Sequence, residues 1–275
     1  LASRVGLGGA RILACPTHDT ASAVAATPLE PGWAYISSGT WSLVGVERTS
    51  PLLTREALEA NFTNEAGAFG TVRFLKNVMG LWLLESCRRE WGQVGRGSEL
   101  VDLLAGVSAL TDFAGLVAPD DPRFFNPASM VRELRDALAA TGQSPHDDPV
   151  LLTRVILDSL ALRYASVIDD LERVTGARVE GIHVVGGGSL NACLNQATAD
   201  ATARPVAAGP AEATAIGNIL VQAISGGTLG SLAHGRELVR RTFRPRRFEP
   251  QAGRDWDAAK RRYREIESRK AEGRA

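Results

Sequence analysis

The sequence has few of the features that define several common protein classes. It contains three cysteines, Cys15, Cys87 and Cys193, which lie far apart and form no CxxC pair. This spacing excludes a disulfide framework and a thiolate metal cluster, and it is typical of a reducing, cytoplasmic compartment. The longest stretch without a charged residue, 213–235, contains five glycines and several polar residues. It is too polar to span a bilayer, which needs about 20 mainly apolar residues, so we expect a soluble protein.

Charge of one sign is not in excess. Lysine plus arginine and aspartate plus glutamate both total 31, so the net charge is zero. This balance gives no overall electrostatic reason to expect nucleic acid or a membrane as a partner. The charge is nevertheless uneven, because residues 236–275 carry 14 basic and 7 acidic residues. There, Trp256, Ala259, Tyr263 and Ile266 recur at helical spacing, which favours an amphipathic surface helix over a nucleic-acid arm.

Motifs of several well-known active sites are also missing. The sequence has no Gly-Lys pair and hence no Walker A motif, and it has neither HExxH nor GxSxG. Its histidines lack metal-ligand spacing, so no metal ligands are predicted, and His183 within an apolar strand is expected to be structural. The run Gly186-Gly187-Gly188 opens like a dinucleotide motif, but Asn191 replaces the third glycine of that motif. No acidic residue follows the next predicted strand, which also argues against NAD binding.

The apolar pattern alternates between strand and helix signals. Two β-rich segments, 33–37 and 41–47, flank a tight turn at 38–40, which predicts an antiparallel hairpin. A third β-type run precedes a helix, and after an irregular stretch the pattern resumes with a long helix ended by Gly176. In chain order, the elements predicted after the hairpin, including those just mentioned, are the strand 71–74, the helices at about 80–91 and 127–140, the long helix from 152, the strand 181–185, the helix 191–203, the strand 205–208 and the helix 212–225.

The predicted order, β-β-β-α-β-α-β-α, is a three-stranded meander followed by crossover units. That is the layout of a ribonuclease-H-like lobe, the half-unit of actin-like ATPases. We therefore predict an α/β fold whose mixed sheet carries crossover helices on both faces. Residues 1–235 are expected to form this lobe, with an insertion at about 98–150. Residues 236–275 are expected to form a basic helical tail packed on it.

Asp19 stands before an Ala-rich helical segment that stops at Pro28. One interpretation is that Asp19 simply caps this helix. The other is that a carboxylate at the tip of a short helix points into a cleft and orients a substrate hydroxyl. The second interpretation suits phosphoryl transfer, in which positioning matters more than early proton removal.

Two glycine-containing turns are candidates for contact with a phosphate or nucleotide. The turn at 37–42 combines small hydroxyl residues with a glycine, so its N–H and hydroxyl groups can face a phosphate. The segment 182–191 runs from a strand through three glycines to a helix start, which places bare backbone beside a ligand at a helix N-terminus. Each signal alone is weak, because ordinary turns look the same.

Taken together, these segments resemble the C-terminal lobe of the FGGY-type carbohydrate kinases. The likeness extends from about residue 14 to residue 225. It is carried by residues 18–24 (HDTASAV), 37–43 (SSGTWSL), 75–84 (LKNVMGLWLL), 184–188 (VVGGG) and 208–213 (AGPAEA). Any one segment could occur by chance, but five in the same order form a specific signal.

The resemblance implies transfer of the γ-phosphate of ATP to a ketose, with Mg²⁺ bridging the phosphates. It is greatest to members that convert L-rhamnulose to L-rhamnulose 1-phosphate. It implies that Asp19 accepts the proton of the sugar hydroxyl, that His18 and Thr20 touch the ketose beside it, and that Asn77 is a further substrate contact.

The resemblance also implies three nucleotide contacts. Thr40 matches the turn residue that meets the phosphates, and Gly187 matches the glycine-rich turn that borders the adenosine. Glu85 departs from the family pattern, in which glutamine contacts the nucleotide. An ionised carboxylate cannot donate a hydrogen bond, so this contact is absent or made differently.

Family members have two lobes, and the N-terminal one supplies the first phosphate loop and most of the sugar site. No part of this sequence resembles that lobe. We therefore expect that the N-terminal lobe is absent from this chain and acts in cis as its partner, and that the chain alone is inactive. A kinase for another ketose or polyol, such as L-fuculose or xylulose, stays open. So does a non-catalytic actin-like nucleotide-binding module, although the retention of Asp19 favours an enzyme.

Overall fold

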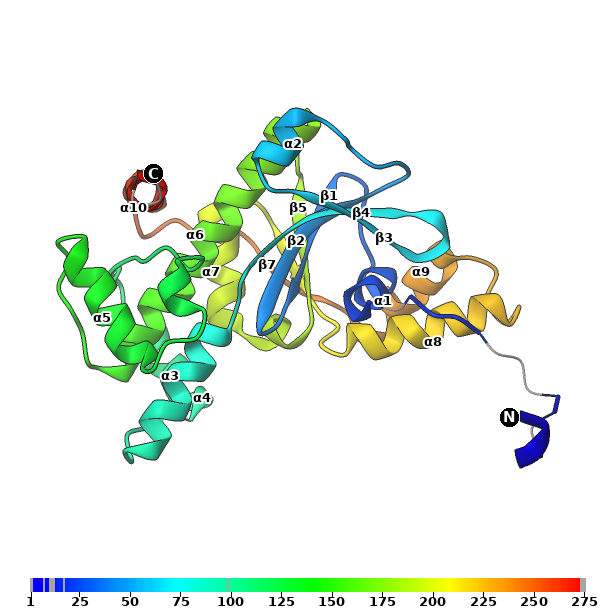
Figure 1. Ribbon diagram of the computed structural model, residues 1–275, viewed down its shortest axis with the longest axis horizontal. Helices are drawn as coiled ribbons and strands as arrows, with labels where there is room; N and C mark the ends of the chain where they lie inside the picture. The colour runs from blue at the N-terminus through cyan, green and yellow to red at the C-terminus, as the bar shows by residue number, and fades with distance from the viewer. Residues whose placement is uncertain (1, 7, 10–12, 17, 98, 273–275) are drawn as a thin grey trace.

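The computed structural model describes residues 2–6, 8–9, 13–16, 18–97 and 99–272. A central sheet lies between two layers of helices (Figure 1). The sheet has seven strands in the order β3-β4-β2-β1-β5-β6-β7. The strands are β1 (Trp33–Ser38), β2 (Trp41–Arg48), β3 (Thr63–Ala66), β4 (Val72–Met79), β5 (Gly181–Val185), β6 (Val206–Ala208) and β7 (Arg246–Phe248).

The five central strands have the arrangement predicted from the sequence. Strand β2 is antiparallel to both β1 and β4, and β5 and β6 continue parallel to β1. The predicted meander followed by crossover units is therefore confirmed. Strand β4 is longer than predicted, since it continues to Met79, and β3 and β7 are antiparallel edge strands that were not predicted.

Helices cover both faces of the sheet, as predicted. Strand β1 shows why, because Ala34 and Ile36 belong to the main core whereas Tyr35 packs on the opposite face with Val24. Alternate side chains of a strand point to opposite faces, so a strand buried along its length needs a helical layer on each side. The helices are α1 (Asp19–Ala26), α2 (Arg55–Glu59), α3 (Trp82–Gln93), α4 (Leu100–Ala109), α5 (Met130–Ala140), α6 (Pro149–Thr175), α7 (Ala192–Thr202), α8 (Ala213–Ser225), α9 (Leu232–Phe243) and α10 (Trp256–Glu272).

The two layers are built from different helices (Figure 1). Helices α6 and α7 lie against the sheet on one side, and α1, α8 and α9 lie on the other. The start and end of α6 follow from its sequence. The Asp148 carboxylate accepts hydrogen bonds from the N–H groups of Val150 (2.9 Å) and Leu151 (3.0 Å), and Gly176 ends the helix in the left-handed conformation.

The stretch 98–150 is more regular than the sequence indicated. It contains α4, which was not predicted, as well as α5, and side chains such as Leu103, Phe124 and Leu134 join the main core. Helix α4 has no side-chain cap and has Gly106 in its interior, which weakened its signal. That this stretch is an insertion stays a prediction.

The basic segment 236–275 contributes to the sheet as well as to the surface. The predicted boundary at residue 235 falls inside α9, and β7 pairs with β6, so this segment also supplies an edge strand. The predicted apolar stripe of α10 is confirmed, because Trp256, Ala259, Tyr263 and Ile266 are all buried in the main core.

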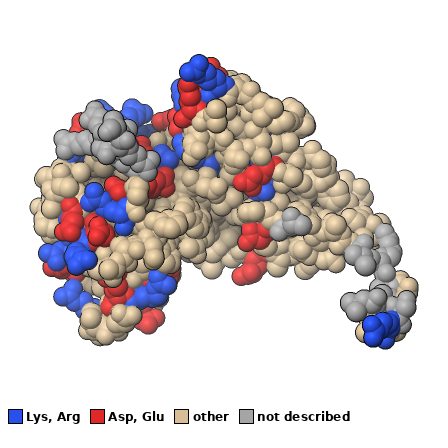
Figure 2. All heavy atoms as spheres, viewed as in Figure 1, with Lys and Arg blue, Asp and Glu red and all other residues tan. Residues whose placement is uncertain are grey.

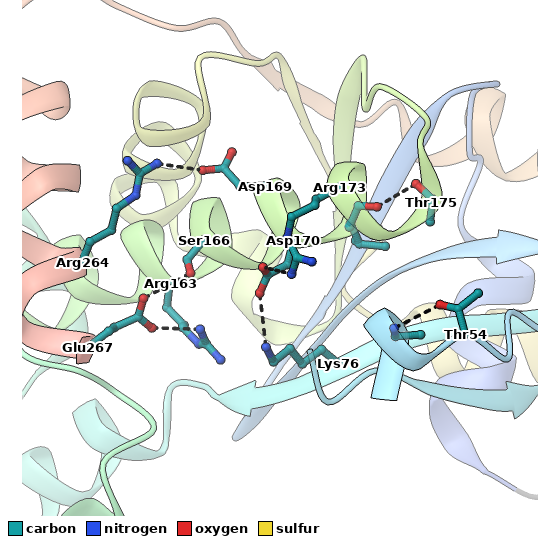
Figure 3. Close-up of polar contacts among 12 residues, drawn as sticks. Thr54, Lys76, Arg163, Ser166, Asp169, Asp170, Arg173, Thr175, Arg264 and Glu267 are labelled. Atoms are coloured by element: carbon teal, nitrogen blue, oxygen red, sulfur yellow. Dashed lines mark hydrogen bonds and ion pairs between the residues drawn. The ribbon is translucent and has the colours of Figure 1, made fainter. Parts of the chain in front are cut away.

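Ion pairs also attach α10 to the body. The Glu267 carboxylate accepts hydrogen bonds from Arg163 (2.9 Å) and Ser166 (3.2 Å) of α6, and Arg264 pairs with Asp169 at 3.3 Å (Figure 3). On the face shown in Figure 2, positive and negative side chains are interspersed over α2 and over the part formed by α3, α4 and α5. The division of the chain into a lobe and a tail stays a prediction, and residues 1 and 273–275 at its ends lie outside the described residues.

The cysteines and His183 have the states that the sequence predicts. All three cysteines are free thiols. His183 is a buried structural residue, as expected, and its Nε2–H donates to the carbonyl of Gly209 at 2.6 Å. Burial lowers the pKa of His183 to about 4, which keeps the ring neutral. Among the described residues, no helix has both the length and the apolar character needed to cross a membrane.

Helix α1 is held in place by a close crossing with α8. All residues of α1 from Ala21 to Ala26 are buried. A Cβ atom added to Gly217 of α8 would lie 1.8 Å from the carbonyl oxygen of Ser22. The two backbones therefore approach more closely than any side chain would allow, and this contact fixes the helix that begins with Asp19.

We predict that Gly217→Ala destabilises the fold. In an unconstrained helix this change would stabilise by about 1 kcal/mol, whereas here the overpacking should cost roughly 1–3 kcal/mol. Urea unfolding would show the loss as a lower midpoint. Gly230→Ala is the control, because no atom lies within 4 Å of the added methyl group. Equal midpoints for both variants would contradict the close crossing.

Candidate functional site

A groove of about 550 Å³ opens at the carboxyl ends of β1 and β5. This is the edge at which open α/β sheets bind their ligands. Six of the seven predicted site residues lie in this groove, and Glu85 alone does not. The groove is lined by His18, Asp19, Thr20, Ser37, Ser38, Gly39, Thr40, Trp41, Leu43, Asn77, Gly186, Gly187, Ala211, Glu212 and Thr214.

The floor of the groove is the hairpin turn between β1 and β2. On one side of the turn, a Cβ atom at Gly80 would lie 2.6 Å from the carbonyl oxygen of Gly39. On the other side, a Cβ atom at Gly188 would lie 2.0 Å from Ser38 Oγ. The N–H groups of Gly80 and Leu81 donate to the carbonyls of Thr40 (3.1 Å) and Gly39 (2.9 Å). The turn is thus held by contacts at Gly80 and Gly188 that are too close for any other residue type, and by these two hydrogen bonds.

Gly187 differs from its neighbours in the glycine-rich turn. A Cβ atom there would meet no other atom within 4 Å, because the residue faces the open groove. Packing within the chain therefore does not require glycine at this position. A bare backbone facing open space is what close approach of a ligand requires.

This contrast predicts different effects for two neighbouring substitutions. Gly188→Ala should lower the stability by roughly 1–3 kcal/mol or prevent folding, because the methyl group would collide with Ser38. Gly187→Ala should unfold at nearly the same temperature as the unchanged chain. Melting curves followed by circular dichroism would measure both. A stable Gly188→Ala variant would contradict the packing of the glycine-rich turn on the hairpin.

Asp19 is the first residue of α1, and the N-cap position is taken by His18, whose side chain makes no capping hydrogen bond. Asp19 therefore does not act as the N-cap. Its Oδ1 accepts a hydrogen bond from the N–H of Thr20 at 2.7 Å and lies 3.4 Å from Nδ1 of His18. The side chain is 75% exposed and lines the groove, so the carboxylate is accessible there to a bound molecule.

A buried arginine, which sequence reasoning missed, orders this end of the groove. The guanidinium of Arg73 is only 1% exposed, and it donates to Thr20 Oγ1 (2.8 Å), Glu65 Oε2 (2.8 Å) and the carbonyl of Ala66 (3.2 Å). It connects β4 with β3 and with the start of α1. Its position within a strand of alternating polarity gave no sign of this role.

The same network of contacts includes His18. Thr20 Oγ1 accepts from Arg73, and it lies 2.5 Å from His18 Nδ1. The Thr20 oxygen has two lone pairs, so while it accepts from Arg73 it either donates its own proton to Nδ1 or accepts a second hydrogen bond from Nδ1–H. The His18 ring also lines the groove, where it is accessible to a bound molecule.

Asn77 and Trp41 separate the groove from a second pocket of about 490 Å³, which both residues also line. The second pocket contains Lys76, whose ammonium lies 3.5 Å from Asp170, and Arg163, whose guanidinium reaches Glu267 (Figure 3). Burial and the nearby Arg163 lower the pKa of Lys76. Trp41 is 44% exposed between the two pockets.

The structure does not bring Glu85 into the groove. It lies in the first turn of α3, and its carboxylate accepts hydrogen bonds from Arg88 at 2.8 and 3.0 Å. Arg88 is three residues further along the helix, so this pair keeps the carboxylate on the helix surface. Its nucleotide contact stays a prediction.

Glu212 adds a carboxylate to the groove that was not predicted as a site residue. It occupies the N-cap position of α8 without a side-chain capping bond, and Thr214 lies beside it in the groove. The segment 208–213 carried part of the family resemblance, which was the available signal. Because β6 is parallel to β5, the loop after it reaches the same edge of the sheet.

Much of the chain matches a known protein family. Residues 34–226 match the domain described as "FGGY family of carbohydrate kinases, C-terminal domain". Among curated relatives, the rhamnulokinase of Bacteroides thetaiotaomicron is 45% identical over 255 residues, which are 92% of this chain and 52% of that protein. The rhamnulokinase of Bacillus subtilis is 40% identical over 245 residues, or 89% and 50% of the two chains. The chain thus spans about half the length of the curated relatives it matches.

Solved structures with the same fold include sugar kinases. The xylulose kinase from Rhodospirillum rubrum superposes with a TM-score of 0.67 at 20% identity, covering 98% of this chain and 54% of that one. The glycerol kinase of Plasmodium falciparum, solved with ADP, gives 0.63 at 14% identity, covering 92% and 49%. These similarities confirm the predicted ribonuclease-H-like, actin-like lobe.

Proposed function

Because this chain belongs to the FGGY family of carbohydrate kinases, we propose that it is half of an enzyme that transfers the γ-phosphoryl group of ATP to a ketose. The observation that carries the proposal is the single groove in which Asp19, Thr40 and Gly187 meet. Phosphoryl transfer needs a nucleotide and an acceptor hydroxyl held side by side. The groove offers the Asp19 carboxylate and the bare backbone of Gly187 among its lining residues.

The ketose we propose is L-rhamnulose, with L-rhamnulose 1-phosphate as the product. Support comes from the curated rhamnulokinases, which are 40–45% identical over about nine-tenths of this chain. L-Fuculose and xylulose are the alternative substrates. Both should be tested in the same assay, because few residues of this groove are proposed to contact the sugar and they do not by themselves select one ketose.

In the proposed reaction the Asp19 carboxylate accepts the proton of the attacking ketose hydroxyl. The hydroxyl oxygen forms a bond to the γ-phosphorus, the bond from that phosphorus to the β–γ bridging oxygen breaks, and ADP leaves with the bond's electrons. His18 contacts the ketose, while Thr20 and Asn77 contact its other hydroxyls. Thr40 meets the nucleotide phosphates.

Gly187 would let the nucleotide lie directly on the backbone. Mg²⁺ neutralises the charge of the phosphates when it is bound with ATP. It is usually held by one or two carboxylates together with phosphate oxygens, and Asp19 and Glu212 are the carboxylates lining this groove. Among the described residues of the groove, these two would hold the ion or its water ligands. The expected cytoplasmic location also stays a prediction.

The complete site is proposed to need a second lobe in the same protein. The relatives are about twice as long as their matched regions, and the carboxylate end of the groove is open, with His18 58% and Asp19 75% exposed. Phosphoryl transfer in water-filled surroundings loses the electrostatic benefit of an enclosed site. We therefore expect the purified 275-residue chain to give no ketose phosphorylation in a coupled ADP-release assay. Steady turnover by this chain would contradict the need for a second lobe.

Asp19→Asn in the full-length protein tests the proposed mechanism. The amide cannot accept the proton, so kcat for L-rhamnulose should fall by about 10²–10⁴-fold, while ATP binding measured by calorimetry should persist. Asp102→Asn is the matched control, because Asp102 is also an exposed aspartate in the first turn of a helix. It should leave kcat unchanged.

Two results would contradict the proposed role. Unchanged kcat in Asp19→Asn would exclude Asp19 as the proton acceptor. ATP binding without phosphorylation of L-rhamnulose, L-fuculose or xylulose by the unsubstituted full-length protein would favour a nucleotide-binding module instead of a kinase.

A further inference from the structure

A third pocket, separate from the groove, lies where the C-terminal segment meets α6 and α7. It has a volume of about 600 Å³ and shares no lining residue with the groove. Four arginines line it, Arg154, Arg246, Arg247 and Arg254, whereas Glu249 is the only acidic residue among its lining residues. The arginines come from α6, β7 and the segment that joins β7 to α10.

Two of these arginines share one buried carboxylate. Arg154 Nε lies 2.9 Å and Arg254 Nη1 lies 2.5 Å from the same oxygen, Oδ2 of Asp158. The Asp158 side chain is 1% exposed, and those of Arg154 and Arg254 are 9% and 15% exposed. One carboxylate cannot neutralise two guanidinium groups, so this buried cluster keeps a positive charge beside the pocket.

Arg254 is also held rigidly. Its guanidinium lies over the rings of Phe113 and Trp256, with distances of 4.5 and 4.4 Å to the ring centroids. Stacking and the ion pair fix the plane of the group before any ligand arrives. A preorganised guanidinium loses little side-chain entropy when it binds an oxyanion.

Arg246 adds a second positive charge with no acidic partner among the described residues. Its guanidinium lies 4.8 Å from the ring centroid of Phe248. Arg247, in contrast, pairs with Glu30 at 2.9 Å. Asp200 also lies beside the pocket, since its Oδ1 accepts hydrogen bonds from Gln196 Nε2 (2.7 Å) and from the N–H of Gln251 (2.8 Å). The nearby acidic residues thus equal the four arginines in number, and Arg246 is the arginine of the pocket that pairs with none of them among the described residues.

The N-terminus of α7 contributes to the same pocket. Ala192 and Cys193, the first two residues of α7, line it, and the Asn191 side chain caps the N–H of Leu194 at 3.0 Å. The N–H groups of the first helical residues have no partner within the helix. They carry the positive end of the helix dipole, which favours a bound anion.

We propose that this pocket binds a phosphate group, either as inorganic phosphate or as the phosphate of a small metabolite. Guanidinium groups match the oxygens of a phosphate in a planar, bidentate geometry. A phosphate bound here would contact α6, β7 and the segment before α10, and so would attach the C-terminal segment to the lobe. The site does not depend on the proposed kinase activity.

Calorimetric titration of the 275-residue chain with inorganic phosphate, at constant ionic strength set by chloride, tests the proposal. We expect saturable binding and a melting temperature that rises with phosphate concentration, because a ligand of the folded state stabilises it. Glycerol 3-phosphate, titrated in parallel, identifies the source of the phosphate. Tighter binding of the ester indicates a metabolite site, and binding of inorganic phosphate alone indicates a site for the free ion.

Arg246→Gln is the diagnostic variant, because this exposed side chain pairs with no acidic residue among those described and its loss should leave the fold intact. It should weaken phosphate binding by about tenfold or more, the effect of losing one charge-assisted hydrogen bond. Arg261→Gln, which removes the same charge from an exposed position of α10 outside the pocket, is the control and should bind like the unchanged chain. Arg254→Lys keeps the charge beside Asp158 but loses the planar group, and should also bind more weakly.

Absence of saturable phosphate binding by the unchanged chain would overturn the proposal. So would equal binding by the Arg246→Gln and Arg261→Gln variants, which would assign the phosphate to another surface or to the groove.

Discussion

The backbone of the hairpin turn between β1 and β2 is contacted on both sides by other backbone segments, and the groove depends on these contacts. Gly80, between β4 and α3, packs on one side, and on the other Gly186 packs on the backbone of Ser38 and Gly188 on its side chain. Each contact is too close for a Cβ atom. The turn therefore has one position relative to β4 and β5, which brings Thr40 and Gly187 to the same groove.

Much of the fold was predictable because its central strands and helices carry strong periodic patterns. The hairpin, β5, and helices α6 to α8 were predicted close to their observed bounds. The missed elements had weak local signals. Strand β3 is short and polar, β7 consists of two arginines and a phenylalanine, and α9 has Gly235 in its interior. Such elements form because tertiary contacts hold them, which a local pattern does not reveal.

The candidate site was predictable where residue type and chain position matched a family motif, and less so where it depends on contacts across the fold. Arg73 orders Thr20 and His18 from a strand 53 residues away. Its role follows only from the packing of β4 beside α1. Glu85 shows the opposite case, since its place in a motif suggested a nucleotide contact but its ion pair with Arg88 lies outside the groove.

A crystal structure of the full-length protein with ADP and L-rhamnulose bound would show whether both ligands occupy this groove. The diphosphate should lie against the backbone of Thr40 and Gly187. A ketose hydroxyl should lie within about 2.6–3.2 Å of an Asp19 carboxylate oxygen, the reach of a general base. Ligands bound outside this groove, or a sugar with no hydroxyl near Asp19, would contradict the proposed role of the groove.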